Sequence, residues 1–484
     1  MSKQNLSYTR QQTFSLGQLA PIGLQEVLPG DRFVHRTRMM ARLSTLVAPV
    51  MHRVNVSISH WFIPTRLIWT NFESFITNKT TPTFPTLTMP ASAGATGYDL
   101  CEMLGAPSEL AGTAINALPI RCYNLVYNEF FRDQDIIAAR AEDETDMAIA
   151  AWEKDYFTTA RSSPQQGAAV TFDLSGTVPV RGIGILSGDF GQTNVASLLE
   201  SGDTGTTTHT YAKAAQSSQA ADAFYLEGDG GSPERPNIHA DLNSANIGIT
   251  IEEWRRAMGL QRFAELRARF GSRYTDYLRM LGVSPGDQRL QRPERLGSER
   301  SSVAFSEVLA TAETGTSVDV GDQAGYAIAG AGRKKYRAFF PEHGYVLSLC
   351  AFRPKAIYAN AIERHWLYRT YDDYFQPELE LEGPQAVTNL ELKADHASPN
   401  ATFGYVERNN HLRRSLSQVM GLFKTTDTSW HFARDFASDP ALNSTFLECV
   451  PSTDPFADTA APQIRANIAH DLYANRIIRK HAKI

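Results

Sequence analysis

The segment Arg269–Gly297 reads RFGSRYTDYLRMLGVSPGDQRLQRPERLG, and AFSEVLAT follows at Ala304–Thr311. An arginine-rich helical stretch ends near Gly282, because glycine is typical of the residue that follows a helix. A turn is predicted at Ser284–Asp287, rich in turn-forming residues. The chain then enters, through Arg292–Pro293–Glu294, a run of alternating apolar residues, which is the pattern of a half-buried strand. This order of helix, turn and strand matches no catalytic motif.

Five further blocks flank this segment, in the order EVLPGDRF (Glu26–Phe33), HWFIPTRLIWTNFESF (His60–Phe75), EHGYVLSLCAFRP (Glu342–Pro354), FGYVERNNHLRRSLSQVMGLFK (Phe403–Lys424), and TSWHFARDF with DPALNSTFLE (Thr428–Glu448). Together the six blocks resemble the major capsid proteins of the Microviridae, gokushovirus-like shell subunits of small tailless phages with circular single-stranded DNA. They bracket most of the chain from about residue 14 to 448. The segment Tyr98–Asn246 contains none of the family's sequence motifs, and the tail after Cys449 resembles the family only loosely.

Strand signals support a mainly β fold with insertions. The segment Arg53–Phe62 alternates between two sets of residues, Val54, Val56, Ile58 and His60 on one side and Asn55, Ser57, Ser59 and Trp61 on the other. Pro64 ends this predicted strand, because proline cannot donate a hydrogen bond to a neighbouring strand. Further strands are predicted at Thr177–Leu186, Ser301–Thr311, Tyr345–Phe352 and Ala401–Val406. The family resemblance specifies the type: one viral jelly-roll domain over residues 1–484, an eight-stranded antiparallel sandwich with long, partly helical loop insertions.

Two insertions stand out in composition. Ser187–Glu234 is rich in Gly, Ser, Thr and Ala and has one basic residue, so it is expected to be an exposed loop. It lies within residues 161–245, which the resemblance identifies as the inserted protrusion of the family at a three-fold axis. Residues 249–281 form a predicted helical insertion that begins with a capping box, Thr250 and Glu253. Its predicted buried stripe is Ile251, Trp254, Met258, Phe263, Leu266 and Phe270. Its seven arginines could bind phosphate or form a solvated, ion-paired face.

Charge is distributed unevenly along the 484 residues, whose formal net charge is −5. Residues 1–66 carry eight Lys and Arg against two acids, and residues 462–484, a predicted basic C-terminal tail, carry five against one. Basic ends on an acidic body suit contact with a polyanion, although scattered solvated cations would give the same composition. The candidates for DNA contact are Arg32, Arg36, Arg38, Arg476, Arg479, Lys480 and Lys483.

Composition and motifs give no sign of catalysis. Apolar residues make up 42% and charged residues 20%, as in ordinary globular proteins. Four separated cysteines lack zinc or disulfide spacing, the twelve histidines contain no H-E-x-x-H, and G-x-x-x-x-G-K-[ST] and G-x-S-x-G are absent. The cluster Glu142, Asp143, Glu144 and Asp146 is read as a solvated helix start, with weak divalent-ion binding as the alternative. We therefore expect no enzyme activity, cofactor or bound metal.

Aromatic residues crowd His60–Phe75, and subunit interfaces are rich in aromatics and arginine. Interface candidates are Trp69, Phe72, Arg273 and Arg292. The resemblance implies a subunit that self-assembles through pentamers into a T=1 shell around circular single-stranded DNA. It also implies an internal scaffolding protein, a DNA pilot protein and a host surface receptor as partners. No apolar run of membrane-spanning length or secretory h-region is found, so a virion protein assembled in a bacterial cytoplasm is expected. The alternative function is a carbohydrate-binding or carbohydrate-hydrolysing β-sandwich.

Overall fold

The structure of the protein is a computed structural model. It describes residues 2–91, 99–170, 180–181, 183–185, 198–201, 208–211, 239–240, 250–283, 286–309, 323–332 and 334–478. The chain divides into two compact units, Met1–Gln166 with Ala264–Ile484, and Gly167–Phe263. Most of the predicted loop Ser187–Glu234 lies outside the described residues.

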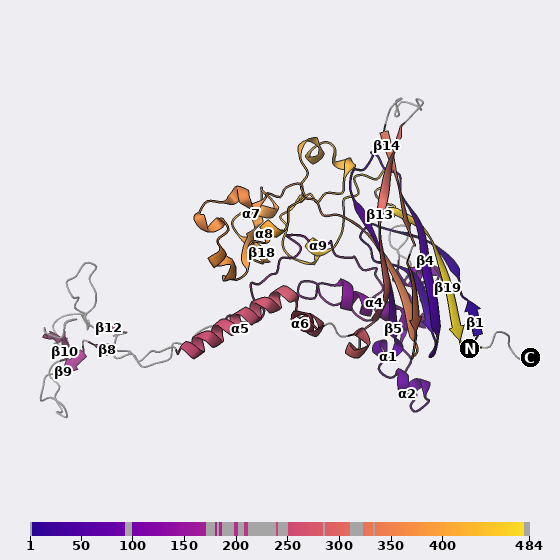
Figure 1. The fold of residues 1–484 in the computed structure, drawn as a ribbon, viewed down its shortest axis with the longest axis horizontal. Helices are drawn as coiled ribbons and strands as arrows, with labels where there is room; N and C mark the ends of the chain where they lie inside the picture. The colour runs from indigo at the N-terminus through magenta and orange to yellow at the C-terminus, as the bar shows by residue number, and fades with distance from the viewer. Residues whose placement is uncertain are drawn as a thin grey trace, which may run out of the picture. The chain divides into compact units, whose positions relative to one another are not determined.

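A curled antiparallel sheet dominates the larger unit (Figure 1). Its strands are β1 (Ser2–Asn5), β2 (Tyr8–Phe14), β3 (Ala20–Val27), β4 (Arg32–Leu43), β5 (Val54–Pro64), β13 (Glu294–Leu309), β14 (Gln323–Ala331), β15 (Lys335–Phe339), β16 (Gly344–Pro354) and β19 (Ile464–Arg476). The order is β1-β19-β4-β14-β13-β5-β16-β3, with β2 also pairing with β19 and β15 with β4. The predicted fold class, mainly β of the jelly-roll type with long insertions, is confirmed. Ten described strands replace the expected eight because short strands share the long partners β4 and β19.

The sheet curls so that its two halves pack face to face, one half with β4, β15 and β19 and the other with β5 and β16. Met39 on β4 places its Sδ 3.9 Å from the Sγ of Cys350 on β16, which belongs to the other half. Phe340 follows β15, and its ring centroid lies 5.0 Å from Phe33 and 4.7 Å from Phe62. Such interdigitation of the two inner faces is how a β-sandwich buries its core.

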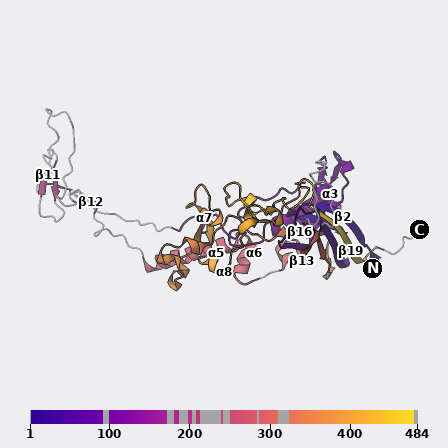
Figure 2. The ribbon, with the colours of Figure 1, turned by 90° about the horizontal axis from the view of Figure 1, so that it is seen from above.

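The outer sides of the two halves differ. Helices α1 (Thr65–Ile68), α3 (Leu100–Leu104) and α4 (Leu118–Val126) cover the half that contains β5 and β16, where Trp61, Leu347 and Leu349 share a buried cluster with them. Arg10 of β2 donates to the backbone carbonyls of Met103 and Leu104 in α3, and the two elements can be followed in Figure 2. On the other half, the outward side chains of β4, β15 and β19 are largely exposed.

The remaining elements are short apart from α5 (Ile251–Phe270). The other helices are α2 (Phe72–Ile76), α6 (Tyr274–Met280), α7 (Asn389–Leu392), α8 (Asn410–Arg413), α9 (Ser444–Leu447), the π-helix η3 (Tyr127–Phe131), and the 3-10 helices Ser108–Leu110, Asp287–Leu290, Arg364–Leu367, Tyr371–Asp373, Pro377–Leu381, Gly421–Lys424 and Thr428–Trp430. Strands β6 (Thr86–Thr88) and β7 (Ala114–Asn116) form one pair, and β17 (Gln385–Thr388) and β18 (Thr402–Val406) another. Strands β9 (Ile183–Ile185), β10 (Leu198–Ser201) and β11 (Thr208–Tyr211) form a small sheet, and β8 (Val180–Arg181) pairs with β12 (His239–Ala240).

Several local predictions are confirmed. The strands predicted near Arg53–Phe62, Tyr345–Phe352 and Ala401–Val406 correspond to β5, β16 and β18. In the capping box at the start of α5, the Thr250 amide donates to Glu253 Oε2 at 2.9 Å and the Glu253 amide donates to Thr250 Oγ1 at 3.2 Å.

Three local predictions need correction. The apolar stripe of α5 is exposed, and Ala268 is the one described residue of the helix that is buried. Helical periodicity of apolar residues predicts that one face of the helix is apolar, but it does not predict that the same chain covers that face. Residues 462–484 were predicted as a tail, yet 464–476 form β19 in the sheet. The acidic cluster is a loop rather than a helix start, with Asp143 paired to Arg121 at 2.6 Å.

Candidate nucleic-acid interface

Strand β4 builds one open side of the sheet. Its sequence RFVHRTRMMARL alternates, so Phe33, His35, Thr37, Met39, Ala41 and Leu43 are buried and the residues between them face outward. Successive side chains of a strand point to opposite sides of the sheet, which converts this alternation into one apolar and one basic side. The outward side of β4 carries four arginines, at positions 32, 36, 38 and 42.

Neighbouring strands add cations to the same side. Residues that are directly opposite in an antiparallel pair point the same way. Lys335 of β15 is opposite Arg36, and Arg465 of β19 is opposite Arg42. We call the resulting surface the basic face, which consists of Arg32, Arg36, Arg38, Arg42, Lys335, Arg337 and Arg465.

Most of this charge is uncompensated. Within the described part of the chain, Arg42, Lys335 and Arg337 form no ion pair, whereas Arg38 Nη2 lies 2.8 Å from Asp471 Oδ1. The side chains of that pair are 57% and 33% exposed, and such surface pairs are weak and easily exchanged for another anion. The basic face therefore presents a concentrated positive potential that would attract a polyanion.

A groove of about 910 Å³ continues the basic face toward β5 and β13. Arg36, Arg38, Arg53, Arg300 and Lys355 line it. Two carboxylates also line it, and both already have partners. Glu153 accepts from the Asn55 amide at 3.0 Å, and Glu299 accepts from the backbone amides of Gly332 and Lys334 at 2.9 and 3.1 Å.

The turn after β14 shapes this groove. Gly332 has φ +137°, and a Cβ there would lie 2.7 Å from Arg38 Cα and 2.8 Å from the Thr37 carbonyl oxygen. Only glycine allows this close approach to β4. The Gly332 carbonyl accepts from Arg36 Nε at 2.8 Å, which orients that guanidinium at the groove.

The residues predicted to contact DNA lie in different parts of the structure. Arg32, Arg36 and Arg38 lie together on the basic face. Arg476 has an internal role: its side chain is 12% exposed, and its Nε lies 3.1 Å from the fully buried Asp31. Arg479, Lys480 and Lys483 lie outside the described residues.

Trp69 and Phe72, predicted at a subunit interface, belong to one aromatic cluster within the chain. Trp69 is 6% exposed, and its ring centroid lies 5.0 Å from Phe75 and 5.2 Å from Phe84. Phe72 is half-buried and packs against His343 at 5.5 Å. Phe75 and Ile76 of the same helix, α2, remain exposed.

Arg273 and Arg292, the other interface candidates, tie α4 and η3 to the segment quoted first. Arg273 donates to the backbone carbonyls of Asn128 and Glu129 at the end of η3, where orphan carbonyls attract a cation. Arg292 Nε lies 3.0 Å from Glu129 Oε2, and its guanidinium stacks 4.4 Å from the Phe130 ring centroid.

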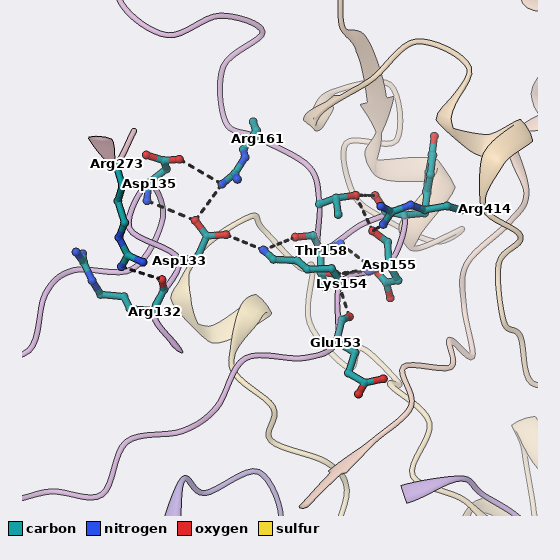
Figure 3. A network of polar contacts seen from close by, with 12 residues as sticks. Arg132, Asp133, Asp135, Glu153, Lys154, Asp155, Thr158, Arg161, Arg273 and Arg414 are labelled. Atoms are coloured by element: carbon teal, nitrogen blue, oxygen red, sulfur yellow. Dashed lines mark hydrogen bonds and ion pairs between the residues drawn. The ribbon is translucent and has the colours of Figure 1, made fainter. Parts of the chain in front are cut away.

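A network of ion pairs holds the same region (Figure 3). Asp133 contacts Lys154 Nζ at 2.6 Å and Arg161 Nη1 at 2.9 Å. Burial by itself would raise the pKa of Asp133, but Lys154 and Arg161 outweigh it and leave that pKa lowered. These contacts pair the charges within one subunit, so this network stabilises the segment from Asp133 to Arg161 rather than forming an open site.

A second polar cluster is closed inside the sandwich. The Ile22 carbonyl can only accept, so His470 Nε2 donates to it at 2.9 Å and His470 Nδ1 must accept. His35 Nε2 then donates to His470 Nδ1 at 3.0 Å, and Tyr336 donates its hydroxyl to His35 Nδ1 at 2.9 Å. Burial lowers the pKa of His35 to about 2, of His60 to about 3 and of His470 to about 4. All three imidazoles are therefore neutral at pH 7.

Neither a metal centre nor a membrane span emerges from the described residues. Within them, no group of three or more His, Cys, Asp or Glu is arranged to hold a metal ion. No helix among them combines the length and apolarity needed to cross a bilayer.

Sequence reasoning missed several cations of the site, among them Arg300, Lys335, Arg337 and Lys355. They lie in the middle of the chain, far from its basic ends. The alternation of Arg32–Leu43 and of KYRAF at Lys335–Phe339 was the available signal, because period two predicts that alternate residues share one side of a strand.

Jelly-roll sandwiches of this kind are found in viral capsid domains, among other protein classes. Comparison with known families agrees, since residues 1–481 match the family described as "Capsid protein (F protein)". The chain belongs to this capsid protein family, and the resemblance to Microviridae capsid proteins is confirmed.

Individual relatives carry the same name, "Capsid protein VP1". The protein of Bdellovibrio phage phiMH2K is 33% identical over 472 residues, covering 92% of this chain and 87% of the relative. That of Chlamydia phage 1 is 29% identical, covering 96% and 92%. That of Spiroplasma virus 4 is 28% identical, covering 92% and 87%.

Proposed function

We propose that this protein is the major shell subunit of a small phage and that its basic face lies against packaged single-stranded DNA. The uncompensated charge of the basic face carries this proposal. Sequence-independent binding of a single strand combines a positive surface with aromatic platforms, and it requires no reaction and no base-edge readout. We propose no enzymatic activity for the chain.

The proposed assembly is a T=1 shell built through pentamers in the cytoplasm of the bacterial host. Closed shells require interfaces whose rotations close into rings, and such interfaces are rich in aromatics. Family membership and the exposed aromatic surface of α2 support this assembly. Phe72 would lie at that surface, Trp69 would support it from beneath, and Arg273 and Arg292 would hold the adjoining segment.

Further parts of the proposal rest on the family. Residues 161–245 would form a protrusion at the three-fold axis, where a host surface receptor would bind. An internal scaffolding protein would guide assembly, and a pilot protein would accompany the DNA.

Electron microscopy of purified particles, or of the protein co-expressed with its scaffolding protein, tests the proposal. Closed isometric shells with this chain as the dominant band are expected. Small discrete oligomers alone, even with scaffold present, would contradict a shell function and would direct attention to glycan binding.

A further inference from the structure

Two aromatic rings interrupt the basic face. Phe339 is 55% exposed and Tyr473 is 41% exposed, although both residues lie in paired strands. Phe339 is opposite Arg32 in the β15–β4 pair, and Tyr473 is opposite Val34 in the β19–β4 pair. Both rings therefore project from the same side of the sheet as the arginines of β4.

Each ring has a cation beside it. The Arg32 guanidinium lies 5.5 Å from the Phe339 ring centroid, and Lys3 Nζ lies 5.0 Å from that of Tyr473. Strand β4 separates the two rings, which stand two strand spacings apart and are offset by two residues along the strands, ~12 Å in all. Val34, half-buried, lies on the same side between them.

We infer that Phe339 and Tyr473 form a base-stacking platform for single-stranded DNA, with Arg32 and Lys3 holding the flanking phosphates. This inference rests on the proposed function and specifies its ligand: an unpaired strand with accessible bases, rather than any polyanion. A surface cation–π contact is weaker than the stacking of a base on an aromatic ring. An incoming base can therefore displace the cation from the ring and leave it free to pair with the phosphate.

Charge complementarity favours DNA over a second copy of this chain as the occupant. The rings are surrounded by Arg32, Arg337, Lys335 and Lys3, and the net charge of the whole subunit is only −5. Two copies of this basic face placed against each other would repel.

The test compares two ligands of equal charge, a short oligothymidylate and an abasic oligonucleotide of the same length, bound to full-length subunits. Wild-type protein should prefer the thymidylate by at least about fivefold, since stacking adds to the phosphate contacts. The double variant Phe339→Leu/Tyr473→Leu should lose that preference and bind the abasic chain as before. Tyr371→Ala, at an exposed position in the 3-10 helix Tyr371–Asp373, is the matched control and should bind both ligands like wild type.

Different failures are distinguishable. Equal wild-type affinity for both ligands would overturn the platform and leave the proposed DNA contact intact. No affinity for either ligand would overturn both. If the double variant binds both ligands like wild type but no longer forms shells, the rings belong to a contact between copies, and the inference is wrong.

Discussion

The two sides of β4 make opposite uses of one strand. Inward, Phe33 and Met39 pack in the hydrophobic core, and the neutral imidazole of His35 is hydrogen-bonded to Tyr336 and His470. Outward, Arg36 and Arg42 face solvent, and Arg42 has no ion-pair partner within the described residues. The inward side is therefore expected to determine stability and its pH dependence, whereas the outward side is free to serve binding. Each of the following experiments tests this division, from the largest expected effect on stability to the smallest.

Acid should destabilise the subunit through its inward histidines. The lowered pKa values of His35, His60 and His470 mean that the folded protein stays unprotonated where the unfolded chain binds protons. Stability is therefore full above about pH 6.5 and falls as pH decreases, by roughly 1.4 kcal/mol per pH unit for each histidine. Arg10 disfavours the added charge on His470, while Asp471 favours it and Glu299 favours charge on His60.

Denaturant unfolding of subunits between pH 7.5 and pH 5 measures this dependence. His60→Gln should remove about a fifth of the slope, because burial also lowers the pKa of His52 and of His411 to about 4, and one of five such groups is lost. A stability that does not change over this range would show that the interior accepts protons and that the division is wrong.

Phe33→Ala should destabilise the subunit by about 3–5 kcal/mol, since it leaves a cavity beside Phe340 in a rigid core. Arg32→Ala changes the adjacent residue on the outward side and should alter the free energy of unfolding by no more than about 0.5 kcal/mol. Thermal or denaturant unfolding measures the stability of the two variants. Similar losses of stability in both would contradict the division between the two sides of β4.

Thr37→Val should have a smaller effect, about 1 kcal/mol, because it removes the hydroxyl that lies 3.1 Å from His470 Nδ1. Thr9→Val, at an exposed position of β2, is the matched control and should be close to neutral. Equal unfolding free energies for the two variants would mean that the hydroxyl contact contributes nothing.

The triple variant Arg42→Gln/Lys335→Gln/Arg337→Gln should leave stability nearly unchanged but weaken binding to single-stranded DNA. Each lost phosphate contact reduces the slope of log K against log salt by about 0.7, so a decrease near 2 is expected. Lys79→Gln/Arg369→Gln/Lys424→Gln removes the same charge from other exposed positions and serves as the control. Equal loss of slope in both variants would show that net charge, rather than the basic face, determines binding.

The sequence predicted particular elements well where the signal was local. The alternation in Arg53–Phe62 gave β5 to within two residues, and the Thr250–Glu253 spacing gave the start of α5. It failed where the outcome depended on distant residues. The apolar stripe of α5 is exposed, and Arg476 turned inward because Asp31 is buried beside it.

The sequence by itself determined the family, the mainly β class and the excess of cations near both ends, because these follow from residue type and local order. The tertiary structure alone decided which cations act together. Arg42, Arg465 and Lys335 are far apart in sequence, and only strand pairing places β15 and β19 on either side of β4. Register is a non-local property, set when the sandwich closes on its buried face, and it fixes the outward face at the same time.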